Sequence, residues 1–305
     1  MTARMTVSST ERVFEERKKG LTGQRVALHA FLVTVSIAWL FPLVWAIYTS
    51  LRPYGDTAGN ARGYFSIGGS YNFDNFVNAW NQAELPHFYF NTFVIVVPAV
   101  LTVLLFASMV AFAVSRYSFR FNLVLLMIFT AGNLLPQQVV IVPLFRLYLA
   151  LPLPHILNDK DLMYDSYLGI VLIHVAFQLG FCTFVLSNFM KTIPKELNEA
   201  AVVDGADVWT TFWRVIMPLT RPALAALATL EFTWIYNDFF WAYLLMSSGS
   251  KLPITSALNN LQGQFFSNNN LLAAGSILVA LPTLIVYFAL QKQFIAGLTL
   301  GSTKG

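Results

Sequence analysis

The sequence has few charged residues and almost no cysteine. Asp, Glu, Lys and Arg together make up 11% of its 305 residues, less than half of the roughly 25% typical of soluble globular domains. Cys182 is the single cysteine, which excludes an intrachain disulfide. Apolar residues make up 56% of the chain and its mean hydropathy is +0.60. This composition indicates a protein of the lipid bilayer.

Motifs for catalysis are also missing. No phosphate-binding Gly-x-x-x-x-Gly-Lys-Ser/Thr pattern occurs, so the chain itself is not expected to hydrolyse ATP. Its four histidines show neither His-Glu-x-x-His nor Cys/His spacing, and the sequence therefore predicts no metal site and no enzyme. The aromatic residues lie in apolar runs without a basic stripe beside them, which argues against nucleic-acid binding.

Six apolar runs are long enough to cross a hydrocarbon core of about 30 Å, which takes about 20 residues. They cover residues 28–50, 90–114, 121–145, 166–190, 222–246 and 271–291. The first run exceeds the length of a signal-peptide core and no cleavage site follows it, so it is expected to remain as a helix. We therefore expect an all-α integral membrane protein with an N-terminal tail over 1–25 and a six-helix domain over 26–305.

The distribution of lysine and arginine predicts the orientation of these spans. Fourteen of the nineteen basic residues lie in the two terminal segments and in the connections after the second and fourth runs. Positive residues concentrate on the cytoplasmic side of a membrane. Both termini are therefore expected in the cytoplasm, and the net charge of +4 is a signal of topology.

The connection at 191–218 is polar and has the pattern of two short helices. Pro194 suits the first position of a helix, and Gly205 can take the positive φ that ends one. Asp207 is placed to cap a second helix, which Pro218 is expected to end. Apolar side chains recur on it at helical spacing, namely Trp209, Phe212, Trp213 and Ile216. The pattern predicts a helix–turn–helix element at the membrane surface.

This connection resembles the EAA loop of bacterial ATP-binding-cassette (ABC) importer permeases, in which Glu-Ala-Ala precedes a glycine and then Ile-x-Leu-Pro. The matching residues are Glu199, Ala200, Ala201, Gly205, Ile216 and Pro218, with Met217 where the family prefers leucine. The resemblance covers most of the chain and is closest to the MalG-like permeases of carbohydrate importers. Three further stretches carry it: Asn91-Thr92 with Ser115-Arg116, Tyr236-Asn237-Asp238-Phe239, and Gly297 to Gly305. It implies the type I ABC importer (MetI-like) permease fold of binding-protein-dependent inner-membrane components.

The resemblance also implies a function and partners. The chain would form a sugar pathway in the bacterial inner membrane with a second, MalF-like permease, fed by an extracytoplasmic solute-binding protein. Two ABC ATPase subunits would bind ATP and Mg²⁺, and this chain would bind no cofactor. Residues 191–218, hereafter the coupling segment, would dock on the ATPase. Its expected contact residues are Glu199, Ala200, Ala201, Asp204, Gly205, Trp209, Phe212, Ile216 and Pro218. Ser256 to Asn270 would face the solute-binding protein.

Within this set, the two alanines would let the ATPase approach closely and Glu199 would anchor a cation of the partner. Trp209 and Phe212 would fill a cleft on its surface, as large aromatic side chains do at interfaces.

Polar residues inside the apolar runs are candidates for lining the pathway, because an ionised side chain at mid-bilayer costs about 2.5–3.5 kcal/mol. Glu231 and Asp238 lie seven residues apart in the fifth run, with Asn237 beside the second. His174 and Gln178 share a face of the fourth run. For the latter two, interhelical hydrogen bonds are an equally good interpretation, whereas for Glu231 a cavity is favoured.

One alternative function uses the same residues. In an ion-coupled secondary transporter, Glu231 and Asp238 would bind the coupling ion. Such transporters commonly show internal repeats with broken helices, and no matching halves are found in this sequence.

The long connection at 51–89 is expected to hold a short interfacial helix near Asp74 to Gln82.

Overall fold

The computed structural model describes residues 23–57, 66–117, 120–132, 136–261 and 268–299, with side chains described as far as residue 292. Within these ranges the chain is helical, and the only β pairing is an isolated bridge between Pro152 and Leu162. The predicted all-α architecture is confirmed.

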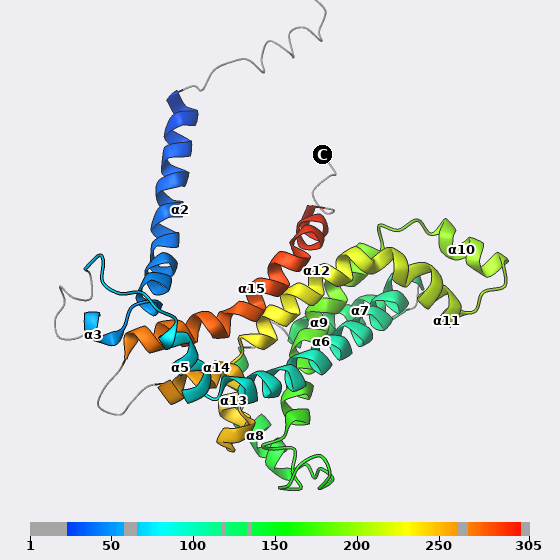
Figure 1. The fold of residues 1–305 in the computed structure, drawn as a ribbon. Coiled ribbons are helices and arrows are strands. Elements are labelled where there is room, and N and C mark those ends of the chain that lie inside the picture. The colour runs from blue at the N-terminus through cyan, green and yellow to red at the C-terminus, as the bar shows by residue number, and fades with distance from the viewer. Residues whose placement is uncertain (1–22, 58–65, 118–119, 133–135, 262–267, 300–305) are drawn as a thin grey trace, which may run out of the picture.

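Five helical stretches are long and apolar enough to cross a membrane. They are α2 (Gly23–Ser50), α6 (Leu85–Arg116), α9 (Tyr167–Met190), the stretch Val208–Tyr236 that contains α12 (Met217–Tyr236), and α15 (Asn269–Thr299). Helices α6 and α9 pack along each other, and α12 packs against α15 (Figure 1). Ala99, Val103, Ala107 and Ala111 line one fully buried face of α6. These small side chains let neighbouring helices approach closely, which favours helix association in a bilayer.

The third predicted span, 121–145, is not one continuous helix. The chain forms α7 (Asn122–Ala131), a 3₁₀ turn (Gln137–Val140) and α8 (Ile141–Ala150). Each α-helix has ten residues, about 15 Å at 1.5 Å per residue, which is half the thickness of the hydrocarbon core. Pro136 disfavours helix in the residue before it and gives no backbone donor, so the break follows from the sequence. The expected count of six spanning helices is therefore not confirmed.

The fifth span also differs from the prediction of 222–246. Helix α12 begins earlier and ends at Tyr236, and a separate short helix, α13 (Phe240–Leu245), follows. Asp238 causes the break: its Oδ2 accepts a hydrogen bond from the backbone N–H of Trp241, 3.2 Å away. Side chains that cap a new helix in this way compete with continuation of the old one. Glu231 and Asp238 therefore do not share one helical face.

Helix α2 stands apart from the other helices over most of its length and joins them at its C-terminal end (Figure 1). Two asparagines hold this end. Asn75 Nδ2 donates to the carbonyls of Ser50 and Arg52, and Asn270 Nδ2 donates to those of Thr49 and Arg52. These bonds satisfy carbonyls that a helix terminus leaves without partners.

Asn75 belongs to α5 (Asp74–Gln82), the short helix expected in this connection, and the predicted helix is confirmed. Asn270 lies in the first turn of α15. The two asparagines thus fasten α2 to the N-terminal part of α15 and to α5.

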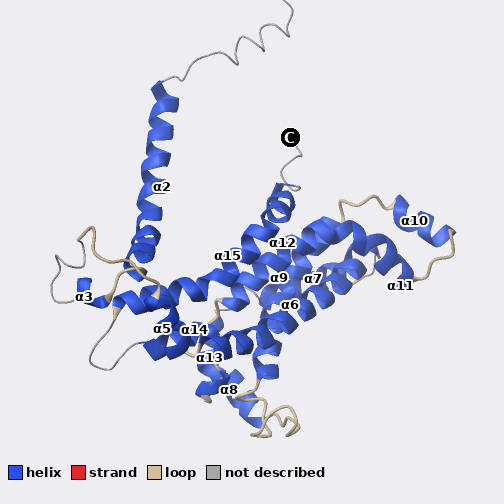
Figure 2. Cartoon of the chain, viewed as in Figure 1, coloured by secondary structure: helices blue, strands red, loops and turns tan. Residues whose placement is uncertain are grey.

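A buried carboxylate joins two loops that lie far apart in the sequence. Asp165, in the loop between α8 and α9 (Figure 2), accepts hydrogen bonds from the backbone N–H groups of Ser247 and Ser248 and from the Ser248 hydroxyl. Its Oδ2 also lies 2.5 Å from Lys160 Nζ. Burial alone would raise the pKa of the Asp165 carboxyl, but the hydrogen bonds from Lys160 and Ser248 outweigh burial and hold this pKa well below its usual range. The network fixes the start of α9 against the end of α13.

Candidate functional site

The first half of the coupling segment is a short helix with a defined end. Helix α10 (Glu196–Val203) begins two residues after Pro194 and stops at Gly205, which has a φ of +80°. The N–H of Ala206 donates to the carbonyl of Ala201, and the N–H of Gly205 donates to that of Val202. This is the Schellman arrangement, in which a residue of positive φ closes a helix. The predicted role of Gly205 as the stop is confirmed.

The second half is continuous with a membrane-spanning helix. Asp207 caps α11 (Val208–Thr210) by accepting a hydrogen bond from the N–H of Thr210 at 2.7 Å, as predicted. A π-helical segment (Thr211–Ile216) then leads into α12. Pro218 was expected to end this helix, and that expectation is wrong. It lies in the first turn of α12, where the missing N–H of proline is tolerated because the wider π turn precedes it.

The predicted contact residues of the coupling segment fall into two groups in the structure. Glu199, Ala200, Asp204, Gly205 and Trp209 are exposed, and Pro218 is partly buried. Ala201, Phe212 and Ile216 are buried in this chain.

The ring of Phe212, 2% exposed, lies 5.2 Å from that of Phe112 on α6, so it fills the chain's own core and does not project toward a partner. Helical spacing alone did not separate the inner face from the outer one.

Arg116 holds the base of the coupling segment. It ends α6, and its Nη1 and Nη2 donate to the carbonyls of Ile193 and Met190 at 3.0 and 2.8 Å. A planar guanidinium can make two such bonds at once, and they are charge-assisted. The sequence singled out Ser115-Arg116 as a family feature but gave it no role. The structure shows that Arg116 ties α6 to the end of α9.

Helices α10 and α11 carry several exposed apolar side chains. Val203 is 86% exposed, Val202 is 60% exposed and Trp209 is 57% exposed. These residues and Glu199 lie on α10 and α11, which are found at one end of the helix bundle (Figure 1). Exposed apolar groups flanked by charges are typical of a docking surface.

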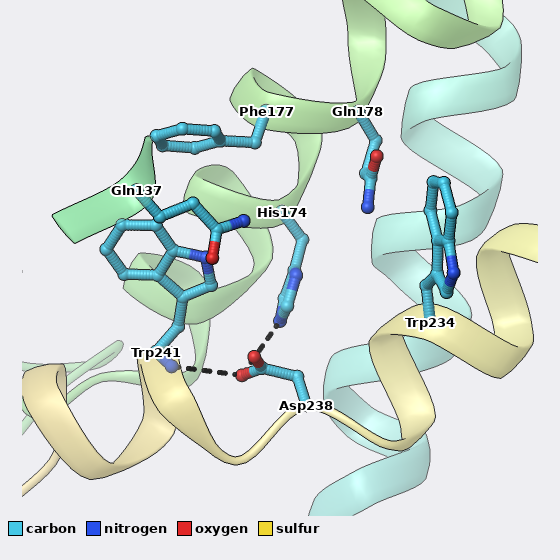
Figure 3. Close-up of a pocket in the computed structure, with 7 residues that line it drawn as sticks. All are labelled: Gln137, His174, Phe177, Gln178, Trp234, Asp238 and Trp241. Carbon is cyan, nitrogen blue, oxygen red and sulfur yellow. Dashed lines mark hydrogen bonds and ion pairs between the residues drawn. The ribbon is translucent and has the colours of Figure 1, made fainter. Parts of the chain in front are cut away.

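A second site is a cavity of about 340 Å³ between α9 and the junction of α12 with α13, hereafter the α9–α12 cavity. Its lining combines four polar and three aromatic side chains, which are Gln137, His174, Phe177, Gln178, Trp234, Asp238 and Trp241. His174, Gln178 and Asp238 were predicted to line a pathway, and the structure brings these three together (Figure 3).

His174 and Asp238 lie next to one another in the lining of this cavity. His174 Nε2 lies 3.6 Å from Asp238 Oδ2, beyond an ordinary hydrogen bond. The Phe177 ring packs against Trp241 at 5.1 Å, and the Trp234 ring packs against Phe181 at 5.6 Å. Sequence reasoning did not identify these aromatic residues, because they sit among many other apolar residues with no distinguishing pattern.

The other two predicted pathway residues do not line this cavity. Glu231 is fully buried, and the thiol of Cys182 donates to its Oε1 at 3.2 Å. Its environment is thus the interface between α9 and α12, contrary to the expectation of a cavity. Asn237 is exposed, and its amide donates to the carbonyl of Thr233 at 2.8 Å.

The loop expected to face the solute-binding protein is described only in part. Residues 262–267 lie outside the described residues. Ser256 and Asn270, the ends of the proposed contact region, are 5% and 1% exposed. Both side chains are therefore packed inside this chain. Among the described residues, no group of three or more His, Cys, Asp or Glu side chains is placed to hold a metal ion.

Comparison with known proteins gives consistent results. The model of a family described as "Binding-protein-dependent transport system inner membrane component" matches residues 103–299. A probable ABC transporter permease of Pyrococcus horikoshii is 31% identical over 87% of this chain and 92% of its own length. The diacetylchitobiose uptake permease NgcG of Streptomyces coelicolor is 28% identical over 90% of this chain and 87% of its own length.

The melibiose/raffinose/stachyose import permease MelC of Bacillus subtilis is 29% identical over 89% of this chain and 94% of its own length. A crystal structure of a bacterial ABC transporter that imports the acidic polysaccharide alginate has the same fold. One of its chains superposes with a TM-score of 0.73 at 22% identity, covering 95% of this chain and 100% of that one. The protein belongs to the family of inner-membrane components of binding-protein-dependent transport systems, the permease subunits of ABC importers.

Proposed function

We propose that this chain is one of two permease subunits of a sugar importer and that its coupling segment docks on an ABC ATPase. The observation that carries the proposal is the geometry of this segment. Arg116 ties α6 to the residues just before α10, and Gly205 closes α10. Glu199 on α10 and Trp209 on α11 are both exposed. Relatives named for diacetylchitobiose and for melibiose, raffinose and stachyose support a sugar as the solute.

The continuity of the second half of the segment supports a mechanism. When two ATPase subunits close on ATP, a partner bound at Glu199 and Trp209 moves α10 and α11 as a rigid body. Because α11 runs through the π segment into α12 without a loop, the movement tilts α12 directly. Helix α12 carries Trp234 and leads to Asp238, so the tilt reaches the wall of the α9–α12 cavity.

The remaining parts of the importer follow from this role. A second permease completes the pathway, and a solute-binding protein delivers the sugar from outside the cell. ATP and Mg²⁺ bind to the ATPase subunits and not to this chain. The protein resides in the bacterial inner membrane with both termini and the coupling segment in the cytoplasm, in keeping with the excess of basic residues on that side.

The ion-coupled alternative draws no support from the arrangement of its two carboxylates. Glu231 lies against Cys182, whereas Asp238 lines the cavity. No observation on the described residues joins them in a single ion site.

A photocrosslinking experiment tests the docking. We expect a benzophenone amino acid at Val203, which is 86% exposed, to crosslink to the ATPase subunit in intact membranes. The same amino acid at Ile67, 91% exposed on the connection after α2, is the matched control and should give no such product. An ATPase adduct at Ile67 but not at Val203 would refute both the docking surface and the proposed orientation.

A further inference from the structure

The α9–α12 cavity offers two kinds of surface to a single ligand. The indole rings of Trp234 and Trp241 stand on its two sides, and Gln178, His174 and Asp238 lie between them (Figure 3). A sugar ring presents the same combination, with apolar C–H faces that stack on the electron-rich faces of aromatic rings and a rim of hydroxyl groups. Small-molecule sites are likewise mostly aromatic or apolar with a few placed polar groups.

The amides in this cavity have unused hydrogen-bonding capacity. Within the part of the chain that the structure describes, the side-chain amides of Gln137 and Gln178 have no hydrogen-bond partner. Each amide offers two donors and an acceptor, which suits hydroxyl groups that both donate and accept. A ligand that displaces water from these amides must replace the lost bonds, and a saccharide does so.

The charge of the cavity restricts the saccharide. The described residues that line it include no lysine or arginine, and Asp238 contributes a carboxylate. A uronic acid placed beside Asp238 would bring two like charges together in a partly desolvated site, which is strongly unfavourable. The volume of about 340 Å³ is at the lower end for small-molecule sites and fits a short segment of a chain of sugars.

We propose that the α9–α12 cavity is a binding subsite for a neutral saccharide, held between Trp234 and Trp241, with Gln137 and Gln178 bonding its hydroxyl groups and Asp238 excluding acidic sugars. This rests on the proposed function in one respect, that the transported solute is a sugar. It adds that this subunit contacts the sugar itself and contributes to the choice between neutral and acidic saccharides.

Direct binding tests the subsite in the assembled importer. The importer is placed in lipid nanodiscs without the solute-binding protein, and saturation-transfer NMR is recorded with melibiose, maltose and diacetylchitobiose and, separately, with digalacturonate. We expect transfer to at least one neutral disaccharide and none to digalacturonate. Trp234→Ala should reduce the neutral signal at least fivefold and Trp234→Phe should retain most of it. Tyr243→Ala removes an aromatic ring that is 74% exposed outside the cavity, and should leave the signal unchanged.

Two polar variants complete the test. Asp238→Asn should allow transfer to digalacturonate. Gln178→Leu should raise the KM for sugar uptake about tenfold, equivalent to ~1.4 kcal/mol, with little change in maximal rate. Gln178→Leu also decides the matter if Trp234→Ala fails to assemble. Neutral and acidic sugars that bind equally well, or binding that is indifferent to Trp234 and Gln178, would overturn the subsite.

ATP-driven sugar uptake by the wild-type importer is measured in parallel and separates the two proposals. Uptake without saccharide contact in the cavity would contradict the subsite alone. Absence of uptake for every sugar tested would contradict the proposed function.

Discussion

Gly205→Val is expected to reduce ATP-driven uptake at least about tenfold while leaving the protein in the membrane. Gly205 has a φ of +80°, a conformation that strains a β-branched residue by about 1–3 kcal/mol. The strain opens the Schellman closure and releases α10 from the position in which it meets the ATPase. Uptake is measured in cells whose membrane levels of the protein are matched by immunoblot.

Gly205→Asn is the informative control. A Cβ at this position would meet no atom within 4 Å, so the size of the side chain is not the difficulty. Asparagine tolerates positive φ far better than valine, and Gly205→Asn should retain most of the uptake. If asparagine and valine were equally harmful, the backbone explanation would fail. Wild-type uptake with valine would remove Gly205 from the coupling mechanism.

Arg116→Met is expected to have the second large effect. It removes both donors to the carbonyls of Met190 and Ile193 while keeping an unbranched side chain. Hydrogen bonds to charged groups contribute about 1.5–3 kcal/mol each. Their loss should therefore make local opening at the base of the coupling segment more frequent than a surface substitution would. Hydrogen exchange of residues 190–198 should accelerate at least tenfold, and uptake should fall with it.

Arg221→Met provides the matched control for this effect. Arg221 is exposed on α12, and surface substitutions usually alter stability by no more than about 0.5 kcal/mol. Exchange at 190–198 should therefore match wild type in this variant. Equal acceleration in both variants would mean that loss of positive charge, and not the two bonds of Arg116, controls the segment.

Local signals in the sequence predicted local structure well. The bounds of α5, the stop at Gly205 and the cap at Asp207 all depend on residues within a few positions of one another, and each is present in the structure. Such features follow from backbone conformation and side-chain capping, which neighbouring residues determine.

Features set by contacts between distant segments were harder to predict. Phe212 has the spacing of a docking face, yet its ring packs against Phe112 on another helix, inside the chain. Pro218 was predicted to end a helix because the π turn that precedes it in the structure has no recognisable sequence pattern. The thiol of Cys182 supplied a partner for Glu231 that only the packing of α9 against α12 could reveal.

The candidate cavity shows the same division. His174, Gln178 and Asp238 were predictable because polar residues are rare in apolar runs and seldom face lipid. Trp234, Trp241 and Phe177 were not, because aromatic residues are common throughout the chain. Only the break of α12 at Tyr236 places Trp241 opposite Phe177.

The energy source of uptake is the most direct test of the proposed function. The importer is reconstituted in liposomes from this chain, the second permease, the ATPase pair and the sugar-loaded solute-binding protein. We predict that uptake requires ATP on the side of the membrane where the ATPase subunits lie and the solute-binding protein on the opposite side. Collapsing the proton and sodium gradients should leave this uptake unchanged. Uptake by this chain alone that follows an imposed proton or sodium gradient and ignores ATP would contradict it.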